Sequence, residues 1–206
     1  MNRNLLLPTA AVTAAVLLAA CGGDKKTPAV AGSQTAAGTS ASTSTGAASN
    51  DADVKFAQDM IVHHRGAIAM AKLAGTRAGN AEVKALAGKI EAAQGPEIAA
   101  MSGWLTNWGK EVPKDDTKGG MDHGGGASPM PGMMTDQEMA ALEKASGAEF
   151  DKMFLEMMTK HHEGAIMMAK GEQANGQDTS AKDLAGKIIA DQTAEIATMR
   201  GLLQSV

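Results

Sequence analysis

The sequence contains the dipeptide His-His twice, and each copy lies in the same pattern of methionine, glycine and alanine residues. Four of the five histidines of the chain belong to these two copies. The first copy comprises Met60, His63, His64 and Met70, and the second comprises Met158, His161, His162 and Met168. Soft thioether groups, alone or with imidazoles, are donors that favour Cu(I), and by the same logic Ag(I). The pattern therefore indicates soft-metal binding.

The two copies belong to a longer duplication with a constant offset of 98 residues. Residues 53–105 align without a gap to residues 151–203, and 25 of the 53 aligned positions are identical. Within each repeat, apolar residues recur in steps of three and four, which predicts two amphipathic helices. Asn80 and Asp178 align with each other between these helices and are suitable N-caps. Each repeat is therefore predicted to be an αα-hairpin.

Two such hairpins can bury their apolar faces only against each other, so we expect an all-α four-helix bundle over residues 51–206. The linker between the repeats, residues 113–135, is rich in Gly, Pro and Met. The sequence Thr135-x-x-Glu138 is a capping box. It predicts a short additional helix that ends at Gly147.

The second helix of each repeat supplies further donors on its inner face. They are the methionines Met101 and Met199, and Met157 adds a thioether four residues before His161 in the second repeat. Polar residues on the same face are expected to orient the imidazoles or, alternatively, to hold the helix register as buried polar pairs. These polar residues are Gln94, Glu97, Gln192 and Glu195.

The linker carries an auxiliary set of donors. Fifteen methionines stand against three Phe, two Trp and no Tyr in the chain, and methionine commonly fills gaps in a core. A linker has no core of its own to fill, so its donors favour a loop that captures copper. These donors are Met121, His123, Met130, Met133 and Met134.

The first 50 residues indicate export. Leu5–Ala20 is an apolar run that follows Arg3 and ends in Leu-Ala-Ala-Cys, which is typical of a bacterial lipoprotein signal peptide over residues 1–20. Cys21, the only cysteine, would then carry the lipid and attach the protein to a membrane. Residues 21–50 are mainly Gly, Ala, Ser and Thr, which predicts a disordered tether. We expect an extracytoplasmic protein whose metal site contains no thiolate.

The quoted motifs resemble the bacterial family known as domain of unknown function 305 (DUF305). The family pattern looks like Phe-x-x-x-Met-x-x-His-His, then Ala and Met-Ala, and later Gln-x-x-Glu-Ile and Met. It matches from Phe56 to Met101, and again from Phe154 to Met199. The resemblance implies a ferritin-like bundle and copper binding linked to copper or silver tolerance. One departure is Asp59, which aligns with Met157, so the two repeats need not bind metal alike.

The leading hypothesis is an anchored protein that binds Cu(I), and by extension Ag(I), for sequestration, tolerance or transfer to a copper donor or acceptor protein. It is not expected to be an enzyme. Two alternatives stay open: a ferritin-like metal-dependent oxidase, disfavoured because the sequence lacks Glu-x-x-His, and a structural surface module without metal. The net charge of −4 without a basic block argues against nucleic-acid binding. The oligomeric state is left open.

Overall fold

The computed structural model describes residues 48–115 and 130–206. The proposed signal peptide, Cys21 and most of the proposed tether lie outside the described residues, as do Met121 and His123 of the linker. Those predictions are therefore not addressed by the structure.

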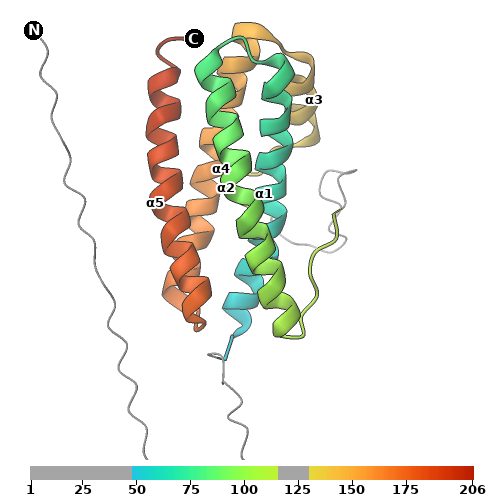
Figure 1. The fold of residues 1–206 in the computed structure, drawn as a ribbon, viewed down its shortest axis with the longest axis vertical. Helices are drawn as coiled ribbons and strands as arrows, with labels where there is room; N and C mark the ends of the chain where they lie inside the picture. The colour runs from blue at the N-terminus through green and yellow to red at the C-terminus, as the bar shows by residue number, and fades with distance from the viewer. Residues whose placement is uncertain (1–47, 116–129) are drawn as a thin grey trace, which may run out of the picture. The chain divides into compact units, whose positions relative to one another are not determined.

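The described chain folds into four long helices and one short one. They are α1 (Asp51–Arg77), α2 (Ala81–Asn107), α3 (Asp136–Lys144), α4 (Gly147–Asn175) and α5 (Thr179–Leu202). The long helices run side by side, and α3 lies outside them near one end of the bundle (Figure 1). The predicted all-α bundle of two hairpins, α1–α2 and α4–α5, is confirmed.

The helix boundaries follow from local capping. Asn80 accepts hydrogen bonds from the backbone at the start of α2, and Asp178 accepts one from Ala181 at the start of α5, so both predicted N-caps are confirmed. The capping box of Thr135 and Glu138 opens α3, as predicted. The predicted role of Gly147 is wrong. Helix α3 already ends at Lys144, and Gly147, with φ of 63°, is the first residue of α4.

The bundle is held together mainly by the two hairpins and by the contact of α1 with α4, whereas α2 and α5 touch far less. Small residues on the facing sides of α1 and α4 allow their close approach: Ala67, Ala71, Ala165 and Ala169 are all buried. The buried apolar residues form two clusters. One contains Phe150 and Phe154, whereas the other contains Phe56 and Leu105.

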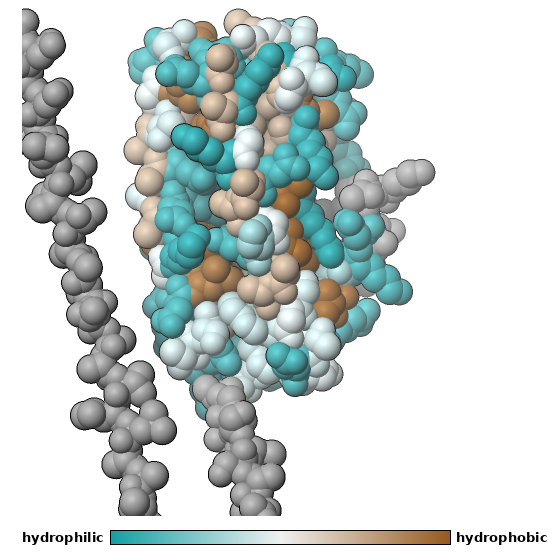
Figure 2. Space-filling model, viewed as in Figure 1, coloured by the Kyte–Doolittle hydropathy of each residue, from teal (hydrophilic) through white to brown (hydrophobic). Residues whose placement is uncertain are grey.

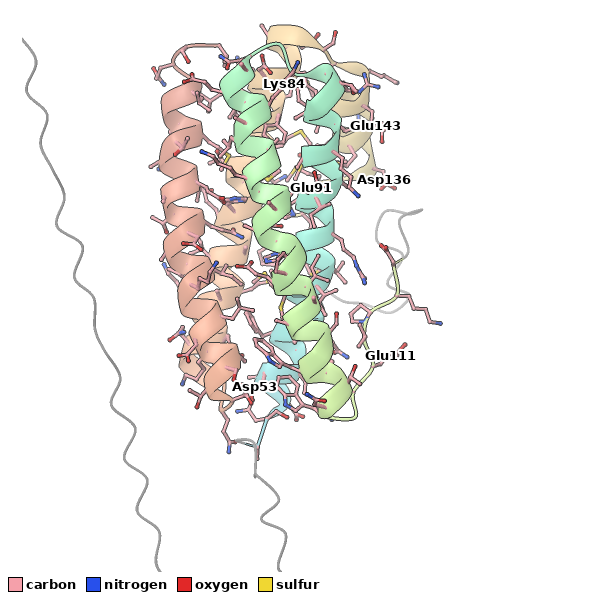
Figure 3. The ribbon with its side chains drawn as sticks, viewed as in Figure 1. Asp53, Lys84, Glu91, Glu111, Asp136 and Glu143 are labelled. Carbon is pink, nitrogen blue, oxygen red and sulfur yellow. The ribbon has the colours of Figure 1, made fainter. Side chains whose placement is uncertain are left out.

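Two buried aspartates fasten each hairpin to the connection of the other. Asp53 of α1 accepts hydrogen bonds from the backbone N–H groups of Gln177 and Asp178, both 2.9 Å away. Asp151 of α4, its aligned counterpart, accepts the N–H groups of Gly79 and of Asn80, the latter at 2.8 Å. Asp53 lies at the end of the bundle where α4 turns into α5 (Figures 1 and 3). We call these two contacts the aspartate clasps.

Only one clasp carries an additional acid. Glu172 is 2% exposed, and its carboxyl oxygens have no hydrogen-bond partner within the described ranges. Burial is the main cause that raises the pKa of Glu172 to about 8, and the neighbouring Asp53 adds to it. Asp178 also raises this pKa, whereas Lys182 lowers it. The aligned residue in the first repeat is Ala74, so this feature is not part of the duplicated fold.

Glu172→Gln is expected to stabilise the protein at pH 8 and to change little at pH 5. The folded state holds the Glu172 proton up to pH about 8, whereas the unfolded chain releases it near 4.5. The stability of the natural protein therefore falls as the pH rises through this window. The variant, neutral throughout, should gain about 2 kcal/mol at pH 8 relative to the natural protein. Urea unfolding of both proteins at pH 5 and 8 checks this, and an equal effect at both pH values would contradict it.

The surface is mostly polar. The face shown in Figure 2 is largely hydrophilic, with apolar side chains showing in the grooves between helices. Met167 of α4, 62% exposed, is the large hydrophobic residue that stands out on the surface of the described chain. No helix within residues 48–115 and 130–206 combines the length and apolar character needed to cross a membrane.

Candidate metal centre

The four paired histidines are all buried inside the bundle. His63, His64 and His162 are 0% exposed and His161 is 1% exposed. The rings of His63 and His161, from α1 and α4, lie against each other with centroids 3.7 Å apart and planes inclined by 39°. Because these two residues are aligned in the duplication, the contact brings equivalent imidazoles together from the two repeats. The structure thus brings together His63 and His161, one histidine from each repeat.

Three of the histidines use only one ring nitrogen. His64 Nε2 donates to Glu97 of α2 at 2.8 Å, and His162 Nε2 donates to Glu195 of α5 at 2.6 Å. His63 Nε2 donates to the backbone carbonyl of Pro131 at 3.0 Å. An acceptor at Nε2 assigns the proton to that atom, so Nδ1 keeps a lone pair.

The remaining ring nitrogens are buried and have no hydrogen-bond partner in the described parts of the chain. We call a ring nitrogen without a hydrogen-bond partner among the described residues an open nitrogen. The Nδ1 atoms of His63, His64 and His162 are open, and both nitrogens of His161 are open. A buried polar atom without a partner costs about 1–3 kcal/mol and calls for an explanation such as a bound ion.

Burial favours the neutral form of His63, His64 and His161. Desolvation lowers the pKa of His63 to about 3 and the pKa of His161 well below its usual value, and the neighbouring imidazoles add to the effect. Desolvation also lowers the pKa of His64, although the hydrogen bond to Glu97 opposes it. Neutral imidazole is the form that binds metal, so these rings are ready to coordinate at neutral pH.

Glu97 differs from Glu195 in its surroundings. Burial alone would raise the pKa of Glu97, but hydrogen bonds from His64 and from Lys187 outweigh it and lower the pKa. The Lys187 Nζ atom lies 3.0 Å from Glu97 and 2.6 Å from Asp191. The equivalent pair of Glu195 and Lys89 forms no such bridge in the described part of the chain. The two histidine–glutamate pairs are therefore chemically distinct.

Most of the predicted thioethers are buried, and they are divided between the two apolar clusters. Met60, Met70, Met101, Met158 and Met199 are 0% exposed, and Met157 is 9% exposed. Met60 and Met101 belong to the cluster of Phe56, whereas Met70, Met157, Met158 and Met199 belong to the cluster of Phe154. Sulfur atoms can be seen between the helices in Figure 3. Met168 is only half-buried, unlike its counterpart Met70.

Residues 130–135, which we call the strap, cross over the histidine pair. Pro131 bonds to His63, and the terminal atoms of Met133 lie beside Gly66, where His161 Nε2 also points. Met134 is 8% exposed and packs in the core cluster of Phe154. The assumption that linker methionines have no core to fill is therefore wrong for Met134, because the strap and α3 dock on the bundle. Met130 and Met133 are half-buried.

The family model described as a domain of unknown function, DUF305, matches residues 53–203. This span contains both repeats, the buried histidines and the strap. The chain belongs to the DUF305 family. The resemblance predicted from the duplicated motifs is thus confirmed. A comparison with curated proteins finds no match.

Solved structures of other proteins share the fold. A DUF305 protein from Streptomyces coelicolor, described as secreted, is 36% identical, with a TM-score of 0.66, covering 75% of this chain and 93% of that one. The protein CopM in its Cu(II)-bound form is 34% identical, with a TM-score of 0.62, covering 74% of this chain and 96% of that one. CopM in its Cu(I)-bound form is 31% identical, with a TM-score of 0.60 and the same coverage.

The structure brings some of the predicted site residues of this DUF305 protein into contact and leaves others apart. The histidines and glutamates form three separate pairs: His63 contacts His161. His64 bonds to Glu97, and His162 bonds to Glu195. Gln94 and Gln192 are buried nearby in sequence, but their side-chain oxygens have no hydrogen-bond partner among residues 48–115 and 130–206, so they do not orient the rings through those atoms. Within the same residues, no three His, Cys, Asp or Glu side chains are arranged to hold an ion.

Sequence reasoning missed three contributors. The Pro131 carbonyl is a backbone group, and a pattern of side-chain types does not indicate which backbone groups form hydrogen bonds. Gly66 and Gly164 are identical in the repeats, and this identity was available as a signal that something approaches α1 and α4 closely. An added Cβ at Gly164 would lie 2.1 Å from the Pro131 oxygen. The glycines make room for the strap.

Proposed function

We propose that this protein binds Cu(I), and Ag(I) by the same chemistry, outside the cytoplasm, and that it sequesters the metal or passes it to a partner protein. One observation carries the proposal: four buried imidazoles present open nitrogens, and three of them donate their other nitrogen to a carboxylate or carbonyl. Metal-binding histidines are typically held in this way. Similar solved structures include CopM, solved with Cu(I), Cu(II) and silver.

The donor set fits a soft ion. Methionine sulfur is a soft neutral ligand that needs no deprotonation, and buried methionines lie on the same helices one turn from the histidines, as Met60 does from His64 and Met158 from His162. We propose that the metal ligands come from Met60, His63, His64, Met70, Met101, Met157, Met158, His161, His162, Met168 and Met199, with Glu97 and Glu195 orienting the rings.

The proposed location rests on the N-terminal sequence. The apolar run before Cys21 supports export and lipid attachment to a membrane, and a relative from Streptomyces coelicolor is described as secreted. A site built without cysteine suits an oxidising compartment, because thioethers do not form disulfides.

We propose a binding role and no catalytic one. A ferritin-like oxidase builds its di-iron centre from carboxylates and the motif Glu-x-x-His, which is missing from the sequence. The carboxylates of Glu97 and Glu195 are occupied by histidine hydrogen bonds. Oxidation of Cu(I) or consumption of peroxide by the metal-loaded protein would contradict this assignment.

Anaerobic titration of the purified protein with Cu(I), against a coloured chelator that competes for the metal, tests the proposal. We expect stoichiometric removal of Cu(I) from the chelator. A native-state ligand raises stability, by about 4 kcal/mol when its free concentration is ~1,000 times the dissociation constant. A melting temperature that Cu(I) and Ag(I) leave unchanged, with no metal taken up, would refute metal binding and favour a purely structural module.

Cu(I) affinity is expected to change little between pH 7 and 5.5. An ordinary imidazole, with a pKa of about 6.5, would be mostly protonated at pH 5.5 and would lose about tenfold in affinity for each ligand. Here burial holds the pKa of His63 at about 3 and that of His161 well below its usual value, so protons compete only at much lower pH. Competition titrations at both pH values, corrected for the chelator's own protonation, provide the measurement. A tenfold or greater loss would show that the ligands are exposed imidazoles.

A further inference from the structure

The strap closes the outer side of the histidine pair. His63 donates its Nε2 proton to the Pro131 carbonyl, so a hydrogen bond joins the strap to the candidate centre. The strap is folded on itself, because the Met133 N–H donates to the Met130 carbonyl at 3.3 Å. Behind it, the His63 and His161 rings are buried. A cation from solvent on this side must therefore pass the strap.

The strap lies on α4 at a contact that only glycine allows. Gly132, with φ of 77°, has a backbone conformation that favours glycine. A Cβ there would lie 2.6 Å from the Lys160 oxygen, and a Cβ at Gly164 would lie 2.1 Å from the Pro131 oxygen. Contacts this short cannot be relieved by side-chain rotation, because the atoms involved are backbone. The closed position of the strap therefore depends on these two glycines.

Met133 reaches the one histidine whose two nitrogens are both open among the described residues. A Cβ built on Gly66 would lie 3.2 Å from His161 Nε2, 3.4 Å from Met133 Cε and 3.6 Å from Met133 Sδ. The thioether and the imidazole nitrogen thus face the same gap above Gly66. Met133 is half-buried, and His161 is 1% exposed. A soft donor at the surface therefore stands next to a soft-metal ligand in the interior.

We propose that the strap is a cover that opens to admit Cu(I), and that Met133 carries the ion from the surface to His161 Nε2. This inference rests on the proposed copper binding and adds its route. Opening frees His63 Nε2 from Pro131 and moves the Met133 thioether to solvent, where it takes up the ion. Closing returns the thioether to the gap above Gly66, where the ion is transferred to the imidazole.

Two aligned glycines give opposite expectations. Gly164→Ala weakens the contact of the strap with α4, so the strap opens more often while it can still close. Cu(I) uptake from a coloured chelator should become about tenfold faster, the factor given by ~1.4 kcal/mol against the closed state. Gly66→Ala places a methyl group between Met133 and His161, and uptake should become about tenfold slower by the same conversion. Met133→Leu, which keeps the bulk but removes the sulfur, should also be slower. Gly171→Ala is the matched control in α4, since nothing lies within 4 Å of its added Cβ among the described residues.

Stopped-flow uptake of Cu(I) from its bicinchoninate complex by the whole protein measures these rates, and hydrogen exchange at the Met133 amide reports strap opening independently. Faster exchange together with faster uptake in Gly164→Ala supports the cover. Faster exchange with unchanged uptake overturns it, as does unchanged uptake in Met133→Leu. If the Gly164→Ala variant fails to fold, Gly132→Ala displaces the strap from its other side. The variants should bind the same number of Cu(I) ions at equilibrium as the natural protein. If the natural protein itself binds no Cu(I), the proposed function is refuted and not merely the role of the strap.

Discussion

His161→Leu is expected to lower the affinity for Cu(I) by about 100-fold or more while leaving the metal-free protein at least as stable. Loss of a partner that merely orients a ligand costs about 10–100-fold in affinity, so loss of a ligand should cost at least the upper end. His161 carries two open nitrogens in a site that is 1% exposed. Replacing an unsatisfied buried polar group by an apolar one of similar size is neutral or stabilising, here by about 1 kcal/mol.

The pairing of the two measurements separates metal binding from packing. If His161 served only to pack the core, its substitution would lower the free energy of unfolding and leave the Cu(I) affinity unchanged. Competition titration and urea unfolding of the same variant give both numbers. Met158→Leu tests the thioethers in the same way, with Met167→Leu as the control, because Met158 is 0% exposed and Met167 is 62% exposed on the same helix. Equal Cu(I) affinity in both methionine variants would remove Met158 from the ligand set.

Asp151→Ala and Asp53→Ala are each expected to destabilise the protein by about 3 kcal/mol, and the double variant should lose much of its folding free energy. Asp151→Ala leaves two backbone N–H groups without their acceptor, those of Gly79 and Asn80. Asp53→Ala leaves three, those of Asn50, Gln177 and Asp178. A lost hydrogen bond to a charged group costs about 1.5–3 kcal/mol. The free energy of unfolding of a typical domain is only about 5–15 kcal/mol. The Asp53 pKa is lowered because its backbone hydrogen bonds outweigh burial, so this clasp should weaken as acid protonates it.

Asp51→Ala is the matched control for the clasps. Asp51 also lies in the first turn of α1 but is exposed, so its loss should cost no more than about 0.5 kcal/mol. Urea unfolding at pH 7 compares the variants. Clasp variants that unfold at the same urea concentration as Asp51→Ala would show that the connections between helices do not hold the hairpins together.

The duplication made much of the fold predictable. The constant offset and the steps of three and four defined two hairpins, and Asn80 and Asp178 were recognisable caps because capping is local. The histidines were predicted to converge because equivalent positions of two packed repeats face the same interior. His63 and His161 do meet.

The rest depends on contacts between distant residues, which periodicity does not encode. The clasp of Asp53 joins residues 124 and 125 positions apart, and the contact of His63 with Pro131 spans 68 positions. Glu172 reads in the sequence as an ordinary surface acid, and its burial follows only from the position of the α4–α5 connection. Gln94 and Glu97 share a helix face, yet His64 bonds to Glu97, and the helical period does not indicate which of the two it contacts.

X-ray absorption at the copper edge of the Cu(I)-loaded protein tests the central claim most directly, namely that the duplicated histidines and methionines bind one class of soft metal inside the bundle. We expect both nitrogen and sulfur neighbours around copper, and we expect both signals to vanish when His63, His64, His161 and His162 are all replaced by leucine. Copper that keeps the same neighbours and the same stoichiometry in that variant would place the metal elsewhere and contradict the account.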